Sequence, residues 1–342
     1  MLGTALLIAA PAHAQYIDIR VSAKFVLNTN GLPPSGTYAT LDGWRLAIDT
    51  ANAGNARCGR GFRYQYPTFD GNLSGYAQYY NLDDTEAVAF EYSVRNNIAQ
   101  TGWRTDALNV YVVNRNLGPK GNESCAGWAS NPEDPISPLA PFNTMKGGMT
   151  VFCAGMGGAP GSGRGILAHE FGHHLGLIHT WANDRVADTV VDADPGPCEQ
   201  PSVPDWCSCK YANTLARAAA QGWSAAVLTA ATNNIMSYHC DNDLDFDLTE
   251  GQLDRWADIA RRHLASEMTG VTYFVDRNNS QGNNDGYSTN PHRTVQAGAS
   301  AASSSHGNIV IVRPGSYNEQ ITLDKPVTLR ATRAGWATIG RP

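Results

Sequence analysis

The chain has 342 residues, enough for one large domain or two unequal ones on a prior of about 150 residues per domain. It carries 25 Lys and Arg against 31 Asp and Glu, a formal charge of −6, and charged residues make up 16% of the sequence. This balance excludes a surface basic enough to neutralise a nucleic-acid backbone. The hydrophobic content of 42%, with 8 Trp, 14 Tyr and 9 Phe, excludes a disordered chain.

The N-terminus reads MLGTALLIAAPAHAQ. An apolar stretch at residues 2–10 is followed by Ala12-His13-Ala14, the small-x-small pattern of a signal-peptidase site. We therefore predict a signal peptide at residues 1–14 and a secreted, extracellular protein; a buried N-terminal strand is the alternative. The apolar stretch is about half of the ~20 residues that a bilayer span needs, so no membrane span is expected.

Strands are predicted at residues 24–28 (KFVLN) and 108–113 (LNVYVV), the second so continuously apolar that it should be central in a sheet. Helices are predicted at residues 40–53, with Thr40 as N-cap, and at residues 84–100. Residues 114–146 are rich in Pro, Gly, Asn and Ser and are expected to form a long loop, followed by a short strand at residues 149–153.

A glycine-rich turn at residues 155–165 precedes a predicted helix at residues 166–175. A second, amphipathic helix is expected at residues 249–268, where Thr249 and Gln252 have capping-box spacing. Composition changes after this helix: a polar, turn-rich stretch is followed by short β-branched runs at residues 309–312, 321–323 and 327–329. We place a domain boundary near Gly270, between residues 15–270 and 271–342.

Seven cysteines predict up to three disulfides and one free thiol in an exported protein. Four of them could instead form a second metal site. The seven cysteines are Cys58, Cys125, Cys153, Cys198, Cys207, Cys209 and Cys240. The candidate ligands of the second metal site are Cys198, Cys207, Cys209 and Cys240.

Residues 169–179 read HEFGHHLGLIH. On a helix, positions i and i+4 lie one above the other, so His169 and His173 can direct a ring nitrogen at one ion. Gly176 can end the helix with a left-handed turn and let His179 approach as a third ligand. Three imidazoles leave one coordination position for water, as in a catalytic Zn²⁺ site. A chance occurrence of the whole pattern is the alternative.

Glu170 lies about 100° around the helix from His169, so it does not share the metal but can reach a water bound there. It is therefore predicted to act as the general base. The zinc ion lowers the pKa of that water and polarises the scissile carbonyl.

Four segments carry a resemblance to a known family: HEFGHHLGLIHTW (169–181), VADTVVD (186–192), NNIMSYHC (233–240) and FDLTEGQ (246–252). Together they resemble the metzincin metallopeptidases and, within them, the pappalysin family, over about residues 20–268. The resemblance implies an α+β, metzincin-type zinc protease domain with a twisted sheet and an active-site helix. It also implies that Met236, in the Met-turn, lies beneath the zinc and that the Tyr238 hydroxyl binds the oxyanion; a core tyrosine is the alternative.

The same resemblance implies that the strand at residues 149–153 is the edge of the sheet and pairs with an extended peptide substrate. Family members also bind structural Ca²⁺, for which solvated acidic loops are the alternative. The candidate ligands are Asp184, Asp188, Asp192 and Asp194, or Asp241, Asp243, Asp245 and Asp247.

Residues 271–342 resemble the opening of a right-handed parallel β-helix of the pectin-lyase-like kind. The matching segments are VTYFVD, then NPHRTVQAGASAA as a capping helix, then NIVIVRPGSYNEQITLDKPVTLRA. A solenoid needs about three or more coils to bury its core, and this segment supplies about two. It is therefore predicted to be a small accessory module, with glycan contact as a function to test.

These observations predict a secreted zinc-dependent endopeptidase that acts on protein or peptide substrates. An alternative from another class is a catalytically idle metzincin scaffold that displays a glycan-binding β-helix module. A third interpretation, hydrolysis of a non-peptide ester or amide, uses the same residues. No nucleic-acid partner is expected.

Overall fold

The computed structural model describes residues 16–117, 127–129, 132, 149–153, 164–182, 184–198, 205–237, 239, 246–282, 284–304, 307–333 and 335–340. The predicted signal peptide and Tyr238 lie outside these residues. Within them, every helix is too short or too polar to cross a bilayer.

A five-stranded sheet with the order β4-β2-β6-β9-β8 organises the N-terminal part of the chain. Its strands are β2 (Val21–Val26), β4 (Thr68–Leu73), β6 (Leu108–Val113), β8 (Gly127–Ala129) and β9 (Met149–Cys153). The first four strands in this order are parallel, and β8 is antiparallel to β9. Strand β6 is buried along its whole length and lies in the centre, as its apolar run predicts. The prediction that residues 149–153 form the edge was wrong, because β9 is paired on both sides and β8 is the edge strand.

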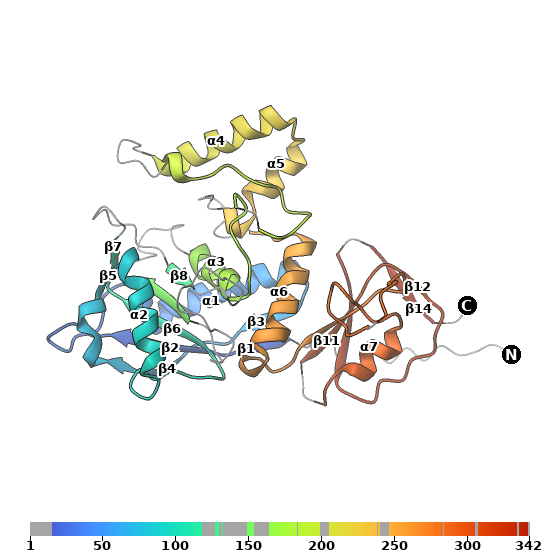
Figure 1. Cartoon of the computed structure of the whole chain (residues 1–342), viewed down its shortest axis with the longest axis horizontal. Coiled ribbons are helices and arrows are strands. Elements are labelled where there is room, and N and C mark those ends of the chain that lie inside the picture. The colour runs from blue at the N-terminus through green and yellow to red at the C-terminus, as the bar shows by residue number, and fades with distance from the viewer. Residues whose placement is uncertain are drawn as a thin grey trace.

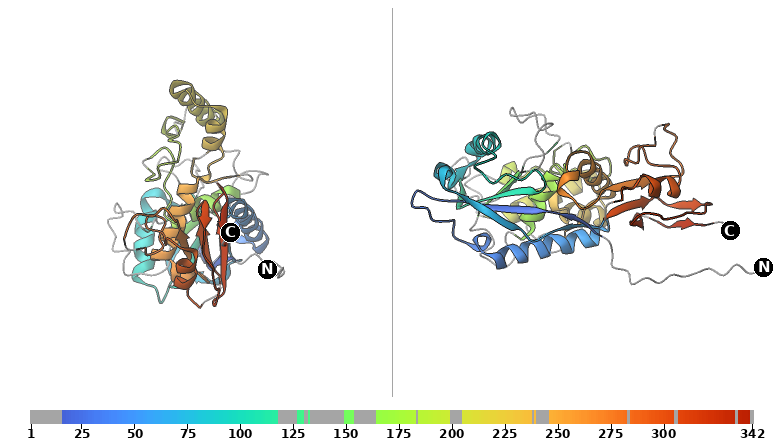
Figure 2. Two further views of the ribbon diagram at one scale, coloured as in Figure 1. Left: turned by 90° about the vertical axis from the view of Figure 1, so that its right-hand side faces the viewer. Right: turned by 90° about the horizontal axis from the view of Figure 1, so that it is seen from below.

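Helices cover both faces of this sheet (Figures 1 and 2). Helix α1 (Leu41–Cys58) and helix α3 (Arg164–His174) pack on one face, where Val110 and Val112 of β6 join their apolar side chains. Helix α2 (Asp84–Asn96) packs on the other face against Tyr111 and Val113. This alternation along β6 is the two-residue period of a strand buried on both sides.

Local signals set the ends of these helices. Thr40 caps α1 by accepting from the Gly43 amide at 3.2 Å, and Gly59 ends the helix in a left-handed conformation with φ of 73°. Helix α6 (Glu250–His263) begins at the predicted capping box, in which Thr249 and Gln252 each accept from the other's backbone amide. Side-chain caps of this kind satisfy amides that the first turn leaves without partners.

Two further helices follow the third histidine: α4 (Trp206–Gln221) and α5 (Ala225–Thr232) project together from the body of the molecule (Figure 1). Neither helix was predicted from the sequence, and both are rich in alanine. The short elements are β1 (Ile17–Ile19), β3 (Phe62–Tyr64), β5 (Asn81–Asp83), β7 (Arg115–Leu117), η1 (Thr37–Ala39), η2 (Ser74–Tyr79), η4 (Gly196–Cys198), η5 (Ile235–Ser237) and η7 (Ala265–Glu267).

The C-terminal part stacks parallel strands beside α6 (Figure 1). Strands β10 (Thr272–Val275), β11 (Asn308–Val312) and β13 (Val327–Ala331) form one parallel sheet, and β12 (Gly315–Tyr317) pairs in parallel with β14 (Ala337–Ile339). Helix α7 (Val295–Ala301) packs against β10 and β11. The predicted strand at residues 321–323 does not form. The β-helix itself stays a prediction.

The two parts of the chain share one apolar core. Phe274, Ile309 and Ile311 of the C-terminal strands belong to the same buried cluster as Phe62 and Trp256 of the N-terminal part. The opposite face of β10 and β11 packs in a separate cluster with α7. The C-terminal module therefore covers apolar surface of the rest of the chain as well as its own.

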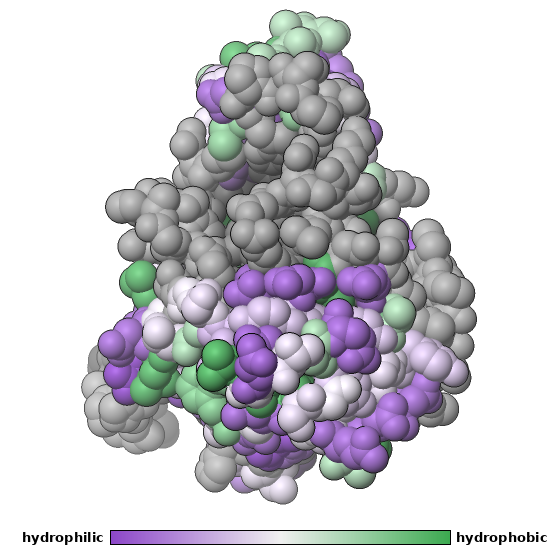
Figure 3. Space-filling model, turned by 90° about the vertical axis from the view of Figure 1, so that its left-hand side faces the viewer, coloured by the Kyte–Doolittle hydropathy of each residue, from purple (hydrophilic) through white to green (hydrophobic). Residues whose placement is uncertain are grey.

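An ion-pair network reinforces this junction. Arg60, with 2% of its side chain exposed, contacts Glu250 at 2.7 Å and Asp254 at 2.5 Å on α6. From the C-terminal module, Arg313 reaches Asp254 at 3.0 Å and Arg333 reaches Glu250 at 3.3 Å. On the side of the molecule at the left of Figure 1, the residues that are coloured in Figure 3 mix hydrophilic and hydrophobic types, as on a solvated surface.

Candidate metal centre

Helix α3 carries the first two histidines of the motif. His169 and His173 lie one turn apart on α3, with ring centroids 4.7 Å apart. His169 is buried and His173 is half-buried. The i, i+4 spacing alone accounts for this pairing.

A glycine turn brings in the third histidine. Gly176 has φ of 85°, and the amides of Gly176 and Leu177 donate back to the carbonyls of His173 and Gly172, both at 2.9 Å. A Cβ at Gly176 would lie 2.6 Å from Cγ1 of Ile259 on α6, so only glycine fits between the two helices. The chain reverses here as predicted, and His179 returns toward α3.

The Nε2 atoms of the three histidines converge on one point. His179 Nε2 lies 3.2 Å from His169 Nε2 and 2.9 Å from His173 Nε2. Ligand atoms on a tetrahedral Zn²⁺ at about 2.0–2.1 Å lie about 3.3 Å apart, close to these separations. Among the residues that the structure describes, this is the one group of three His, Cys, Asp or Glu side chains close enough to share an ion.

Backbone carbonyls hold two of the rings in the orientation that a metal requires. His169 Nδ1 donates to the Ile235 carbonyl at 2.7 Å, and His173 Nδ1 donates to the Leu177 carbonyl at 2.8 Å. With the proton on Nδ1, the Nε2 lone pair faces the common point. Burial, with the neighbouring His173, lowers the pKa of His169 to about 3 and that of His179 strongly. Neutral imidazoles are the form that binds metal, so the residues fit a zinc ion.

Glu170 follows His169 in α3 and is buried. Its side chain is 4% exposed, and burial raises its pKa to about 8. The edge strand β8 passes directly over it: a Cβ on Gly127 would lie 2.5 Å from Glu170 Cγ. A cation at the histidines would favour the ionised carboxylate.

Met236 packs against α3 at Gly172. It is fully buried in η5, and a Cβ on Gly172 would lie 2.7 Å from its sulfur. Its amide is held by the Asn234 side chain at 3.0 Å, and its carbonyl accepts from the Thr180 amide at 3.2 Å. The η5 segment therefore touches both the helix and the loop that carries His179.

A buried cluster supports this loop from the other side. Trp181 stacks on His179 with ring centroids 4.2 Å apart, and the Lys210 ammonium lies 5.1 Å from the Trp181 ring. Lys210 also donates to Asp192 at 2.7 Å, and Asp192 lies 3.1 Å from His239 Nε2. Burial would raise the pKa of Asp192, but hydrogen bonds from His239 and Lys210 hold it below its usual value. Sequence reasoning missed this cluster, because its members lie far apart in the chain.

The candidate calcium ligands make contacts within the chain, and calcium binding stays a prediction. Asp192 is paired with Lys210, so its negative charge is already matched by a buried ammonium. Asp188 accepts from Thr249 Oγ1 at 2.7 Å and from the Gly251 amide at 2.9 Å at the start of α6. Asp184 and Asp194 each accept from a nearby backbone amide. Asp247 pairs with Arg333 at 2.6 Å, while residues 241, 243 and 245 lie outside the described ranges.

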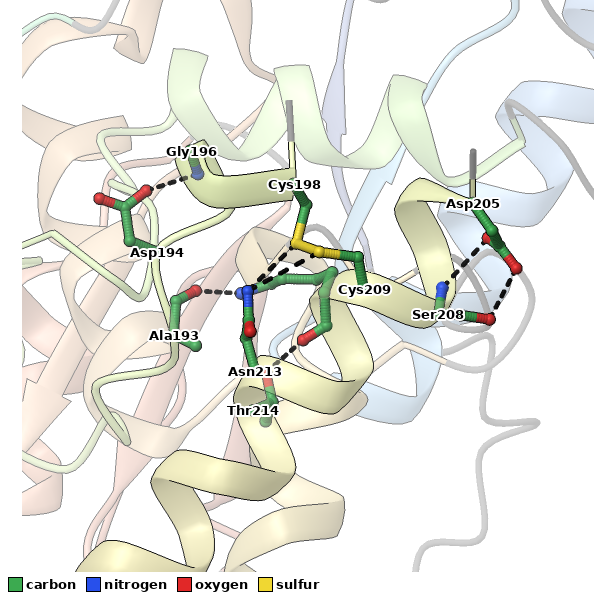
Figure 4. Close-up of a disulfide and its surroundings, with 10 residues drawn as sticks. Ala193, Asp194, Gly196, Cys198, Asp205, Ser208, Cys209, Asn213 and Thr214 are labelled. Atoms are coloured by element: carbon green, nitrogen blue, oxygen red, sulfur yellow. Dashed lines mark hydrogen bonds between the residues drawn. A yellow bond between two sulfur atoms is a disulfide. The ribbon is translucent and has the colours of Figure 1, made fainter. Parts of the chain in front are cut away.

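Cysteines form disulfides, as predicted for an exported protein. Cys198 and Cys209 form a disulfide that ties the loop after His179 to α4, and Asn213 donates to Cys198 at 3.1 Å (Figure 4). Cys207 is disulfide-bonded as well, and Cys58 is a buried free thiol. A second metal site at Cys198, Cys207, Cys209 and Cys240 is therefore excluded, since three of the four sulfurs are already in disulfides. Cys125 and Cys240 lie outside the described residues.

Comparisons with known proteins point to metalloproteases. No protein-family model matches the chain. Two proteins of Aspergillus fumigatus, from different strains and each named extracellular metalloprotease, are 33% identical over 119 residues, which is 30% of this chain and 36% of theirs. The chain thus spans about a third of the length of these curated relatives. Among solved structures, Tannerella forsythia mature mirolysin in complex with a cleaved peptide aligns with a TM-score of 0.41 and 17% identity, covering 74% of this chain and 95% of that one. At that score the structural likeness carries no argument, whereas the sequence match relates part of this chain to extracellular metalloproteases.

Proposed function

We propose that the chain is a secreted zinc-dependent endopeptidase of the metzincin class, within its pappalysin family. The observation that carries this proposal is the convergence of three histidine ligand atoms within 4.8 Å of one another, with the buried Glu170 next to His169 in the chain. The Nε2 separations of 2.9 and 3.2 Å are close to those between ligand atoms on one tetrahedral zinc ion. The partial match to extracellular metalloproteases supports the same proposal.

His169, His173 and His179 would hold the zinc ion. When bound, the ion supplies a Lewis acid that polarises the scissile carbonyl and acidifies water. Glu170 takes the proton of the attacking water and passes it to the nitrogen of the leaving amine, which requires it to be ionised before the attack. The carbonyls of Ile235 and Leu177 keep the ligand rings fixed while this proton moves.

Two further roles belong to the proposal. Tyr238 follows Ser237 at the end of η5, the segment whose Ile235 and Met236 touch α3 and His169. Its hydroxyl would donate to the oxyanion that forms on the substrate carbonyl. An extended peptide would add to the free edge of β8, which passes over Glu170, through backbone hydrogen bonds.

The test is cleavage of casein and of a mixed peptide library by the full chain. Glu170→Gln removes the base without changing its size and should lower kcat/KM by about 10²–10⁴-fold while zinc remains bound. Glu86→Gln on α2, on the opposite face of the sheet, is the matched control and should leave cleavage unchanged. Full peptidase activity in Glu170→Gln would overturn the mechanism, and absence of peptide cleavage by the zinc-loaded wild type would overturn the function.

A further inference from the structure

Gly127 on the edge strand β8 lies directly against the side chain of Glu170. A Cβ on Gly127 would lie 2.5 Å from Glu170 Cγ, 3.0 Å from Cδ and 3.2 Å from Oε1. All three distances are below the 3.4 Å at which ordinary van der Waals contact begins. The whole carboxyl arm of Glu170 thus occupies the space that a side chain at position 127 would fill.

The kind of neighbour distinguishes Gly127 from the other tightly packed glycines of the site. Gly172 and Gly176 face Met236 and Ile259, which are fixed in the apolar core. A long unbranched side chain such as Glu170 can instead rotate about its own bonds. An alanine at position 127 would therefore be accommodated by displacement of Glu170 rather than by movement of the backbone.

We propose that Gly127 is a positioning residue for the general base: its missing side chain leaves the space between β8 and α3 in which the Glu170 carboxylate is held beside the histidine triad. This inference rests on the proposed function. A general base acts only within about 2.6–3.2 Å of the proton that it removes. Restoring ordinary contact with an added Cβ requires Glu170 Cγ to move by about 1 Å, and a misplacement of that size costs about 10²-fold in rate.

The experiment compares Gly127→Ala with Gly75→Ala in the full, zinc-loaded chain. Gly75 lies in η2, and a Cβ there would meet no atom within 4 Å. With casein peptides as substrate, Gly127→Ala should lower kcat about 10²-fold and change KM less than 3-fold. The zinc dissociation constant should stay within 2-fold, because the three histidines are untouched. Gly75→Ala should match the wild type in every measurement.

A double-mutant cycle shows whether the effect acts through Glu170. In a Glu170→Gln background the base is already lost, so Gly127→Ala should change the residual rate less than 2-fold. An equal 10²-fold loss in both backgrounds would overturn the proposal, because it would place the role of Gly127 in substrate binding. A Gly127→Ala variant with the kcat of the wild type would also overturn the positioning role. In that case an inactive Glu170→Gln variant would still support the proposed function. Weakened zinc binding would show distortion of the helix and would also overturn the positioning role.

A second measurement tests the position of Glu170 without catalysis, so it can be made even if the chain cleaves no peptide. Co²⁺ replaces zinc, and its visible absorption is followed as the pH is varied. Removing the neighbouring carboxylate with Glu170→Gln should shift the midpoint of this titration. Gly127→Ala should shift the midpoint in the same direction and Gly75→Ala should not. An unshifted midpoint in Gly127→Ala would overturn the positioning role independently of any peptidase activity.

Discussion

Phe274 provides a direct test of whether the C-terminal module and the site-bearing part fold as one unit. Its ring is fully buried in the cluster that includes Ile309 and Trp256, and it lies 6.0 Å from the buried guanidinium of Arg60. Phe274→Ala removes a fully buried ring and should cost about 3–5 kcal/mol. Loss of the contact with Arg60 adds about 0.5–1 kcal/mol, so we expect about 5 kcal/mol in all.

The assay is hydrogen exchange read by mass spectrometry at increasing urea concentration, which gives a free energy of opening for each peptide. Peptides from β10 and β11 and peptides from β1 and α6 should all lose about the same free energy. Val310→Ala perturbs the module from its other side, because Val310 faces the separate cluster with α7. If the two parts unfold as one unit, its cost of about 2 kcal/mol should also appear in the peptides from β1 and α6. If Phe274→Ala loosens only the module, the argument from a shared core is refuted.

Three further predictions concern single sites. Burial lowers the pKa of Lys24 from 10.5 to about 7, so above pH 7 the unfolded chain binds an extra proton. Between about pH 7 and 10 the free energy of unfolding of the wild type should therefore rise with pH relative to that of Lys24→Met, by up to about 1.4 kcal/mol per pH unit. Urea titrations that give the two proteins the same pH dependence of this free energy would contradict the prediction. Gly176→Ala places a side chain at positive φ and against Ile259, and calorimetry should show weaker zinc binding, whereas unchanged affinity would argue against the glycine turn. Lys210→Met leaves the buried Asp192 without its ammonium and should cost about 3–5 kcal/mol. Adding Asp192→Asn to Lys210→Met should restore part of the lost free energy of unfolding. If the losses of the two single variants simply add in the double variant, the two side chains are not coupled.

Local sequence signals predicted the elements that hold the triad. Thr40 and the Thr249–Gln252 box mark helix starts because a side-chain cap depends only on residues within one turn. The reversal at Gly176 depends on one residue that can adopt positive φ. Most of the site geometry is therefore local, within residues 164–182.

The parts that sequence reasoning missed depend on distant partners. Strand β8 has three residues, too few to show a periodic pattern, so the edge was assigned to β9. The Asp192–Lys210 pair joins a loop to a helix that had not been predicted. Phe274 looks like part of a separate module in the sequence and becomes part of the common core only through packing. Tertiary contacts of this kind leave no signature in a short window.

The shared core also bears on the relation between the module and the site. Glu267, in η7 just before β10, is fully buried, and its carboxylate lies 2.8 Å from Nε2 of His174, the residue that follows His173. The chain that leads into the module is thus tied directly to the C-terminal end of α3. This contact gives a physical reason why the two parts should unfold together.

The central claim is a zinc ion held by three imidazoles, and X-ray absorption at the zinc edge tests it most directly. Purified full-length protein loaded with one equivalent of Zn²⁺ should show three histidine nitrogens at about 2.0–2.1 Å, and His179→Ala should reduce the histidine count and release most of the metal. A wild-type protein that binds no zinc, or binds it equally well without His179, would contradict the account.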